Sequence, residues 1–179
     1  MATNTPSVEE WIEDPRVVEL LEERMDHKDY LIFRELNEDG RLSDTELAER
    51  VDLSRTAARR RRKNLQEEGI MEIFALLVFQ QADYTYAEVQ ISYAASATRA
   101  DIDAFIEELV DDALIYEVAE CVGEHDLMIR VWQSSLDDIN VHVREHLQGN
   151  DVVDDYTLVP ITKSHKMFHR DFRTDGDAG

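Results

Sequence analysis

Six cationic side chains fall between residues 55 and 63 of a chain that carries 40 acidic and only 19 basic residues. In a helix whose inner face holds Ala58 and Leu65, the step of about 100° per residue places outward-facing residues on the opposite side. Arginine can donate paired hydrogen bonds to guanine, and neighbouring cations can contact phosphates. The cluster therefore predicts a helix that binds double-stranded DNA, with a solvated charged face as the simpler alternative. The candidate DNA-binding residues are Ser54, Arg55, Thr56, Arg59, Arg60 and Lys63.

Two histidine pairs have a spacing that could serve metal binding. His142 and His146 lie four residues apart in a predicted helix, as do His165 and His169 near the end of the chain. No third ligand is evident beside the first pair, so a solvated helix face is favoured and no metal site is predicted. The second pair lies among basic residues and indicates either a disordered basic tail or a contact with an anionic effector or the DNA backbone.

The sequence contains no signature of an enzyme. We find no nucleophile motif, phosphate-binding loop or paired-carboxylate arrangement for acid–base catalysis. We therefore predict no catalytic residue, no cofactor and no enzymatic activity.

The charge of the chain indicates the conditions in which it works. The formal net charge is −21, lysine is scarce beside arginine, and the acids are spread over nearly every segment. Concentrated salt screens the repulsion that such a charge causes, so the composition predicts a protein of a halophilic archaeon. No apolar run approaches the ~18 residues of a membrane span, and the first residues lack a signal peptide. We predict a cytoplasmic protein without a membrane partner, in which Cys121, the single cysteine, is a buried small side chain.

Helix signals divide the first half of the chain. Pro15 suits the first turn of a helix within an N-terminal extension, residues 1–25. Residues 26–70 then show three helical segments: Gly40 follows the first, Ser43 and Glu46 have capping-box spacing at the second, and Ser54 can cap the third. Two helices joined by a short turn are typical of a (winged) helix-turn-helix DNA-binding domain. Residues 71–83 are predicted to form a linker strand.

The second half alternates between strand and helix patterns. Residues 84–93, 114–122, 127–132 and 152–161 have the periodicity of strands, and residues 98–112 and 135–147 have that of helices. The order β-α-β-β-α-β predicts a ferredoxin-like domain over residues 84–166, followed by a polar tail, residues 167–179. The fold class is therefore α+β.

Four stretches resemble the Lrp/AsnC family, the feast/famine transcription regulators. Residues 25–36 are similar to the opening helix of that family, Asp39-Gly40-Arg41 with Ser43 matches its DGRxS turn, and residues 47–70 continue into its recognition helix. Glu120-Cys121 and residues 123–127 resemble the ligand-domain signature that ends in GxxD. The resemblance covers residues 25–166, with its parts in the right order.

The resemblance implies function as well as fold. It implies a promoter-binding homodimer, in some members a tetramer or octamer, that binds an amino acid or related small effector near the GxxD loop. A glycine there permits close approach of a ligand, and a carboxylate could hold an α-amino group. An ordinary hairpin turn, whose aspartate binds local amides, is the alternative. The candidate effector-binding residues are Gly123, Glu124, His125 and Asp126.

The chain departs from the family pattern at two positions. Arg62 occupies a position that is usually apolar, so it must extend to solvent or pair with an acid. Ile73 replaces a common glycine, which affects the linker. Two other functions use related features: an Lrp-fold enzyme of the sirohaem decarboxylase type, and an architectural protein that coats DNA without a ligand response. The clustered arginines favour a regulator over the enzyme.

Overall fold

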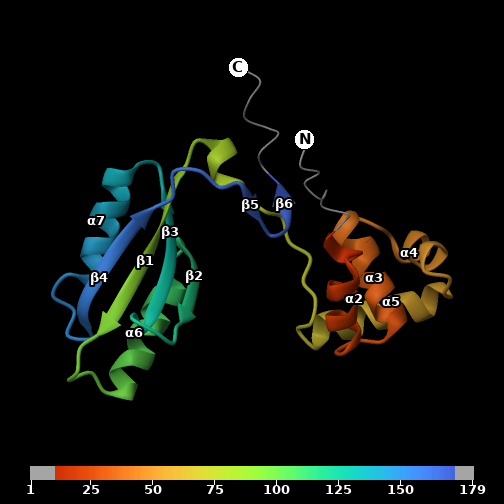
Figure 1. Cartoon of the computed structure of the whole chain (residues 1–179), viewed down its shortest axis with the longest axis horizontal. Helices are drawn as coiled ribbons and strands as arrows, with labels where there is room; N and C mark the ends of the chain where they lie inside the picture. Colours follow the sequence, from red (N-terminus) through yellow and green to blue (C-terminus); the bar gives the residue numbers. More distant parts are fainter. Residues whose placement is uncertain (1–10, 172–179) are drawn as a thin grey trace. The chain divides into compact units, whose positions relative to one another are not determined.

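The computed structural model describes residues 11–171, which form two compact units (Figure 1). The helical unit contains the residues up to Leu76 together with those from His165 onward, and the sheet unit spans Leu77–Ser164. Residues 1–10 and 172–179 of the predicted extension and tail lie outside the described residues. Among the described helices, none is long and apolar enough to cross a membrane.

Four helices of the helical unit lie between Pro15 and Glu67, and each begins at a side chain that accepts a hydrogen bond from the backbone. Asp14, Asp26, Ser43 and Ser54 are the N-cap residues, and Ser43 and Glu46 form the predicted capping box. The last three of these helices pack around a core that includes Ile32 and Leu47, both fully buried. The helices are α2 (Pro15–Glu22), α3 (His27–Glu38), α4 (Asp44–Arg50) and α5 (Arg55–Glu67).

The predicted linker strand is wrong. Residues 71–78 have no regular structure, and residues 79–82 form a short 3-10 helix, η1 (Phe79–Ala82). A strand needs a neighbour that satisfies its backbone N–H and C=O groups, and no strand pairs with this segment within residues 11–171.

Residues 166–171 form a hairpin rather than a disordered tail. Strands β5 (Lys166–Met167) and β6 (Arg170–Asp171) are antiparallel, and both turn residues, Phe168 and His169, have positive φ. The imidazole of His169 stacks on Trp11 with ring centroids 3.6 Å apart, and Phe168 meets Phe74 edge-on at 6.0 Å. These aromatic contacts hold the hairpin against Trp11 and Phe74 within the helical unit.

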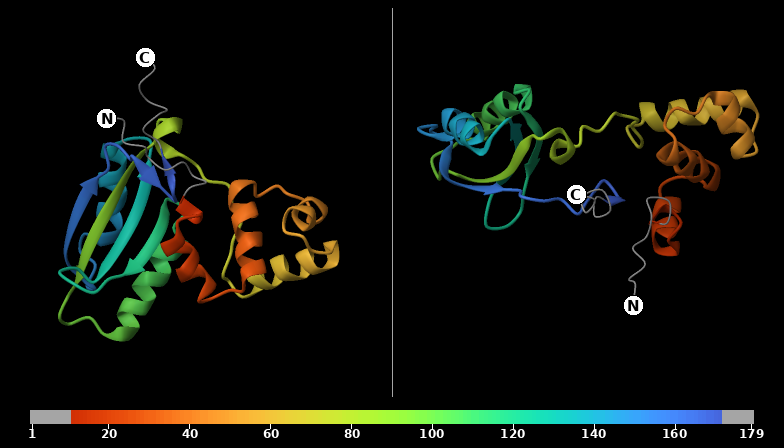
Figure 2. Two further views of the ribbon diagram at one scale, coloured as in Figure 1. Left: turned by 45° about the vertical axis from the view of Figure 1, so that its right-hand side comes forward. Right: turned by 90° about the horizontal axis from the view of Figure 1, so that it is seen from above.

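The sheet unit has the predicted ferredoxin-like topology. Its four antiparallel strands lie in the order β2-β3-β1-β4, and both helices cover one face (Figure 2). Between helices and sheet lies a core of alternate strand residues, such as Val89 and Ile129, with helix residues such as Leu109 and Ile139. The elements are β1 (Thr85–Tyr93), α6 (Arg99–Asp111), β2 (Ile115–Glu120), β3 (Leu127–Gln133), α7 (Leu136–Leu147) and β4 (Val153–Pro160).

The opposite face of the sheet carries aromatic and charged side chains. Phe79 from η1 lies against Tyr86, Tyr116 and Trp132, with ring centroids 5.0–5.6 Å apart. Arg130 pairs with Glu88 and Glu117 of the neighbouring strands. Burial raises the pKa of the Tyr116 hydroxyl to about 12.

Candidate functional site

Helix α5 is held at its start by the turn that follows α4. The turn contains Asp52 in the left-handed region, with φ of 51°, and it ends at Ser54. The Ser54 hydroxyl accepts a hydrogen bond from the Ala57 N–H at 3.2 Å, so this predicted DNA-binding residue also caps the helix. Ala58 and Leu65 are buried, as predicted, and this orientation sets the outward face of α5.

Two of the six clustered cations fix α5 to the rest of the helical unit. Arg61 Nη1 lies 2.6 Å from Asp26 Oδ2 and 2.9 Å from Asp29 Oδ1, both at the start of α3. Arg62 Nη2 lies 2.7 Å from Asp44 Oδ1 at the start of α4. Of the two alternatives predicted for Arg62, extension to solvent or pairing with an acid, the structure shows the second. These two guanidinium groups therefore serve the fold.

The other four cations point away from the core. Arg55, Arg59, Arg60 and Lys63 are exposed, as is Thr56. Lys63 Nζ lies 3.2 Å from Glu67 in an exposed pair, and Arg59 Nε approaches Asp44 only to 3.9 Å. Arg55 and Arg60 form no ion pair with any residue between 11 and 171. The structure thus brings the predicted DNA-binding residues together on the first turns and outer face of one helix.

Sequence reasoning did not identify the aspartates that pair with Arg61 and Arg62 and so leave the other α5 cations exposed. Asp26 caps α3 by accepting from the N–H groups of Lys28 and Asp29, and it also receives Arg61. The pKa of Asp26 is lowered, chiefly by the Asp29 N–H and further by Arg61. In the sequence, Asp26 and Asp29 precede an apolar stripe. This spacing indicates the start of a helix, but it does not show that both acids pair with Arg61.

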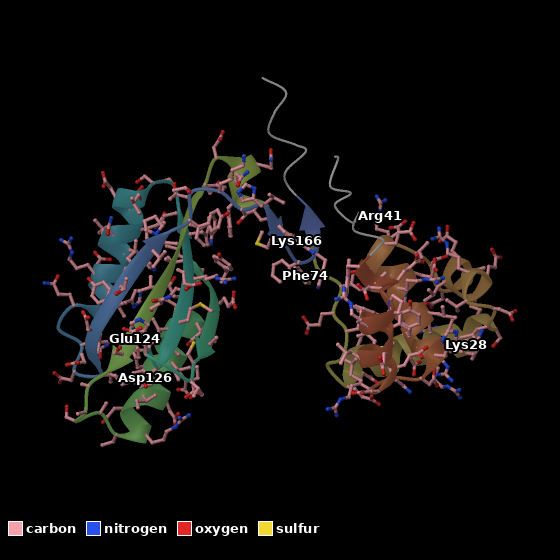
Figure 3. The ribbon with its side chains drawn as sticks, in the orientation of Figure 1. Lys28, Arg41, Phe74, Glu124, Asp126 and Lys166 are labelled. Atoms are coloured by element: carbon pink, nitrogen blue, oxygen red, sulfur yellow. The ribbon has the colours of Figure 1, made fainter. Side chains whose placement is uncertain are left out.

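The GxxD loop joins β2 to β3 at one end of the sheet, where Glu124 and Asp126 are labelled (Figure 3). Asp126 Oδ2 accepts a hydrogen bond from the Tyr93 N–H at 2.8 Å, which ties the loop to the end of β1. His125 Nδ1 lies 3.2 Å from Ser92 Oγ. Gly123 and Glu124 are exposed, and a methyl group at Gly123 would meet no atom within 4 Å. The aspartate therefore has the local amide contact of a structural turn, while the rest of the loop is open.

Polar groups of α6, β1 and β2 lie near this loop. Arg99, at the start of α6, pairs with Glu120 at 3.0 Å. The Tyr93 hydroxyl is buried and has no hydrogen-bond partner among the described residues. Its pKa is raised by burial and by the nearby carboxylates of Glu120 and Asp126. A buried hydroxyl without a partner is costly and indicates a place where a ligand or water can bind.

Two predictions about single residues do not hold. Cys121 is exposed, because it follows the last residue of β2 and belongs to the loop. His142 is not on a solvated face: its side chain is 14% exposed, and Asp112 at the end of α6 lies 3.0 Å away. Asp112 was not recognised as a partner because it precedes the histidine by 30 positions.

Comparisons with known proteins identify the family. Residues 25–70 match the winged helix-turn-helix DNA-binding family. The chain is 32% identical over 143 residues to an uncharacterized HTH-type transcriptional regulator of Pyrococcus horikoshii, covering 80% of this chain and 90% of that protein. It is 30% identical over 131 residues to the leucine-responsive regulatory protein of Rhizobium meliloti, covering 73% and 84% respectively. The chain belongs to the Lrp/AsnC family of transcription regulators.

Solved structures of Lrp/AsnC regulators share this architecture. A complex of a transcriptional regulator from Neisseria meningitidis with L-Met has a TM-score of 0.70 and 25% identity, covering 80% of this chain and 93% of that one. The predicted fold, an N-terminal winged helix-turn-helix followed by a ferredoxin-like domain, is confirmed. Helix α5 is the second helix of the helix-turn-helix that begins with α4.

Proposed function

We propose that this Lrp/AsnC regulator binds promoter DNA through the outer face of α5 and responds to an amino acid or a related small molecule. The observation that carries the proposal is the division of the α5 cations. Arg61 and Arg62 are engaged by acids of α3 and α4, whereas Arg55, Arg59, Arg60 and Lys63 remain exposed around the first turns of the helix. These exposed groups can contact base edges and phosphates in a major groove.

The DNA-binding proposal is tested by removing exposed positive charges from α5, singly and together. Promoter fragments are titrated with wild-type protein and with Arg60→Ala, Lys63→Ala and the double variant, in fluorescence anisotropy at constant salt. The matched control is Arg144→Ala, which removes one exposed cation from α7. We expect the double variant to lose specific binding while the control keeps it. Equal loss in the control would mean that total charge, and not α5, determines binding.

We propose the loop at Gly123, Glu124, His125 and Asp126 as part of the effector site. The support is its open surface, the buried unpartnered hydroxyl of Tyr93 beside it, and the L-Met bound in the Neisseria meningitidis regulator. An α-amino group could be held by carboxylates here and an α-carboxylate by Arg99.

The effector proposal is tested by calorimetry with a panel of L-amino acids. Asp126→Asn should weaken effector binding and blunt the change in DNA affinity, while DNA binding without effector stays intact. Asp137→Asn, which neutralises an exposed acid on α7, is the control. If no amino acid alters DNA affinity, the protein is an architectural DNA-binding protein rather than a sensor.

We further propose a homodimer, which can assemble into tetramers or octamers, formed through the ferredoxin-like domains. The face of the sheet opposite α6 and α7 supports this, because among the helices and strands within residues 77–164 only the short η1 packs on it. The proposed setting is the cytoplasm of a halophilic archaeon, since the net charge is −21. Light scattering at molar and at low KCl tests both points: we expect a dimer in molar salt and a loss of structure in dilute buffer.

We propose that the chain is not an enzyme. The exposed α5 cations serve DNA binding and have no role in tetrapyrrole chemistry. A tetrapyrrole absorption band that copurifies with the protein at one equivalent would support the sirohaem decarboxylase alternative instead.

A further inference from the structure

Three side chains with metal-binding donors converge beside α7 in the sheet unit. Asp112 is the residue after the last turn of α6, and His142 and His146 lie one turn apart on α7. The donor atoms of the three groups lie within 4.8 Å of one another. The side chains are 14%, 14% and 30% exposed for Asp112, His142 and His146, so the cluster is partly shielded from water.

Both imidazoles are directed at the same carboxylate oxygen. His146 Nε2 lies 2.7 Å from Asp112 Oδ2 and is hydrogen-bonded to it. His142 Nε2 lies 3.0 Å from that oxygen but makes no hydrogen bond, and the atom is buried without any partner among the described residues. The hydrogen bond to Asp112 therefore satisfies Nε2 of His146 but leaves Nε2 of His142 without a hydrogen bond.

The other oxygen of Asp112 fixes the orientation of the carboxylate. Asp112 Oδ1 accepts a hydrogen bond from the Leu114 N–H at 2.7 Å, which directs Oδ2 towards the histidines. A carboxylate oriented by an outer hydrogen bond is typical of metal ligands.

We propose that Asp112, His142 and His146 bind one divalent transition-metal ion of the zinc class. Two imidazole nitrogens and one carboxylate oxygen suit Zn²⁺, and three protein ligands leave a coordination position for water. Donors around a tetrahedral ion with bonds of about 2.0–2.2 Å are separated by roughly 3.3–3.6 Å. Asp112 Oδ2 lies 2.7 and 3.0 Å from the two imidazole nitrogens, so binding requires these two spacings to widen by roughly 0.3–0.9 Å. The ion would satisfy His142 and link the end of α6 to α7. This site is separate from the effector loop and does not depend on the proposed function.

The experiment uses the full-length chain without an affinity tag, freed of metal by a chelator and kept in KCl. Zn²⁺ is titrated in competition with a chromophoric chelator, and Co²⁺ is titrated while its visible absorption reports the coordination. We expect one tight site per chain. His142→Gln/His146→Gln and Asp112→Asn should each weaken it by more than about 100-fold, because even outer-shell changes cost roughly 10–100-fold.

The matched control is Asp111→Asn, which removes the exposed neighbouring carboxylate on α6 and should leave the tight site unchanged. Circular dichroism shows whether each variant folds. Should the ligand variants unfold, NMR of the wild type decides the question, because Zn²⁺ should shift the ring signals of two of the six histidines. Equal Zn²⁺ affinity in wild type and ligand variants, or shifts spread over all six histidines, would show only weak binding to the acidic surface and would overturn the proposal.

Discussion

Neighbouring arginines on α5 should have opposite roles, and exchanging them one at a time separates stability from DNA binding. Arg60 is exposed and forms no ion pair within residues 11–171, whereas Arg61 bridges Asp26 and Asp29. Arg60→Ala and Arg61→Ala remove the same charge from adjacent positions of one helix. Arg61→Ala should destabilise the helical unit, and Arg60→Ala should weaken DNA binding without altering stability.

The magnitude follows from the geometry of Arg61. Its two contacts are 2.6 and 2.9 Å long, and its side chain is 27% exposed. Hydrogen bonds to charged groups contribute about 1.5–3 kcal/mol where they are buried, and exposed ion pairs contribute about 0.2–1 kcal/mol. For this partly exposed pair of contacts we expect a loss of about 1–2 kcal/mol in unfolding free energy. The loss should persist in concentrated salt, because the contacts are no longer than the Debye length of about 3 Å at 1 M.

Urea denaturation at constant KCl measures this difference. Replacing Trp132 by Phe leaves Trp11, which lies in the helical unit, as the only tryptophan, so that its fluorescence reports unfolding of that unit. Arg61→Ala should lower the midpoint in this background and Arg60→Ala should leave it unchanged. Equal destabilisation by the two substitutions would refute the assignment of Arg61 to the fold.

Three further predictions concern acid, the core and salt. Because the pKa of Asp26 is lower in the folded protein than its ordinary value of about 3.9, its ionised carboxylate stabilises the fold above that pH, and this stabilisation is lost as the pH falls through the folded-state pKa. Asp26→Asn should therefore reduce the loss of unfolding free energy at acid pH, measured by urea titrations at several pH values. Ile139→Ala, at a fully buried position of α7, should lower the unfolding free energy of the sheet unit by about 2–5 kcal/mol in the same type of experiment. Only four α5 cations are exposed, so a plot of the logarithm of DNA affinity against the logarithm of salt concentration should have a slope no steeper than about −4 per subunit. A slope near that expected for six phosphate contacts would contradict the assignment of Arg61 and Arg62 to the fold.

Local signals were sufficient for most of the fold. The helix starts at Ser43, Ser54 and Ser135 depend on side chains that bind backbone N–H groups a few residues away, and such caps can be seen in the sequence. The alternation of apolar residues around Val89 and Ile91 likewise fixed the buried face of β1. Element order then determined the ferredoxin-like topology.

The errors occurred where structure depends on distant partners. Residues 71–78 have an apolar pattern, but no neighbouring strand receives their hydrogen bonds within the described chain. The hairpin at 166–171 contains only two residues in each strand, and its position depends on stacking between His169 and Trp11, which are far apart in sequence. Neither partner can be identified from local periodicity.

In the candidate sites, too, the features set by local sequence were predicted and those set by distant partners were missed. Helical spacing correctly placed Arg60 and Lys63 outward, and pairing with an acid was one of the two alternatives predicted for Arg62. The third donor beside His142 and His146 was missed because α6 and α7 are joined only through the folded sheet. Sequence spacing detects ligands that share one helix, whereas tertiary packing supplies the others.

In a protein with a charge of −21, the folding role of Arg61 and Arg62 bears directly on DNA binding. The acids nearest to α5 could otherwise attract its outer cations and compete with phosphates. Asp26, Asp29 and Asp44 are instead engaged by the two inner arginines, and Arg59 is left 3.9 Å from Asp44 with 71% of its side chain exposed. The two inner arginines thus offset two of the three negative charges of these aspartates. Under the proposed function, this leaves Arg55, Arg59 and Arg60 able to contact a phosphate backbone that the net charge of the molecule repels.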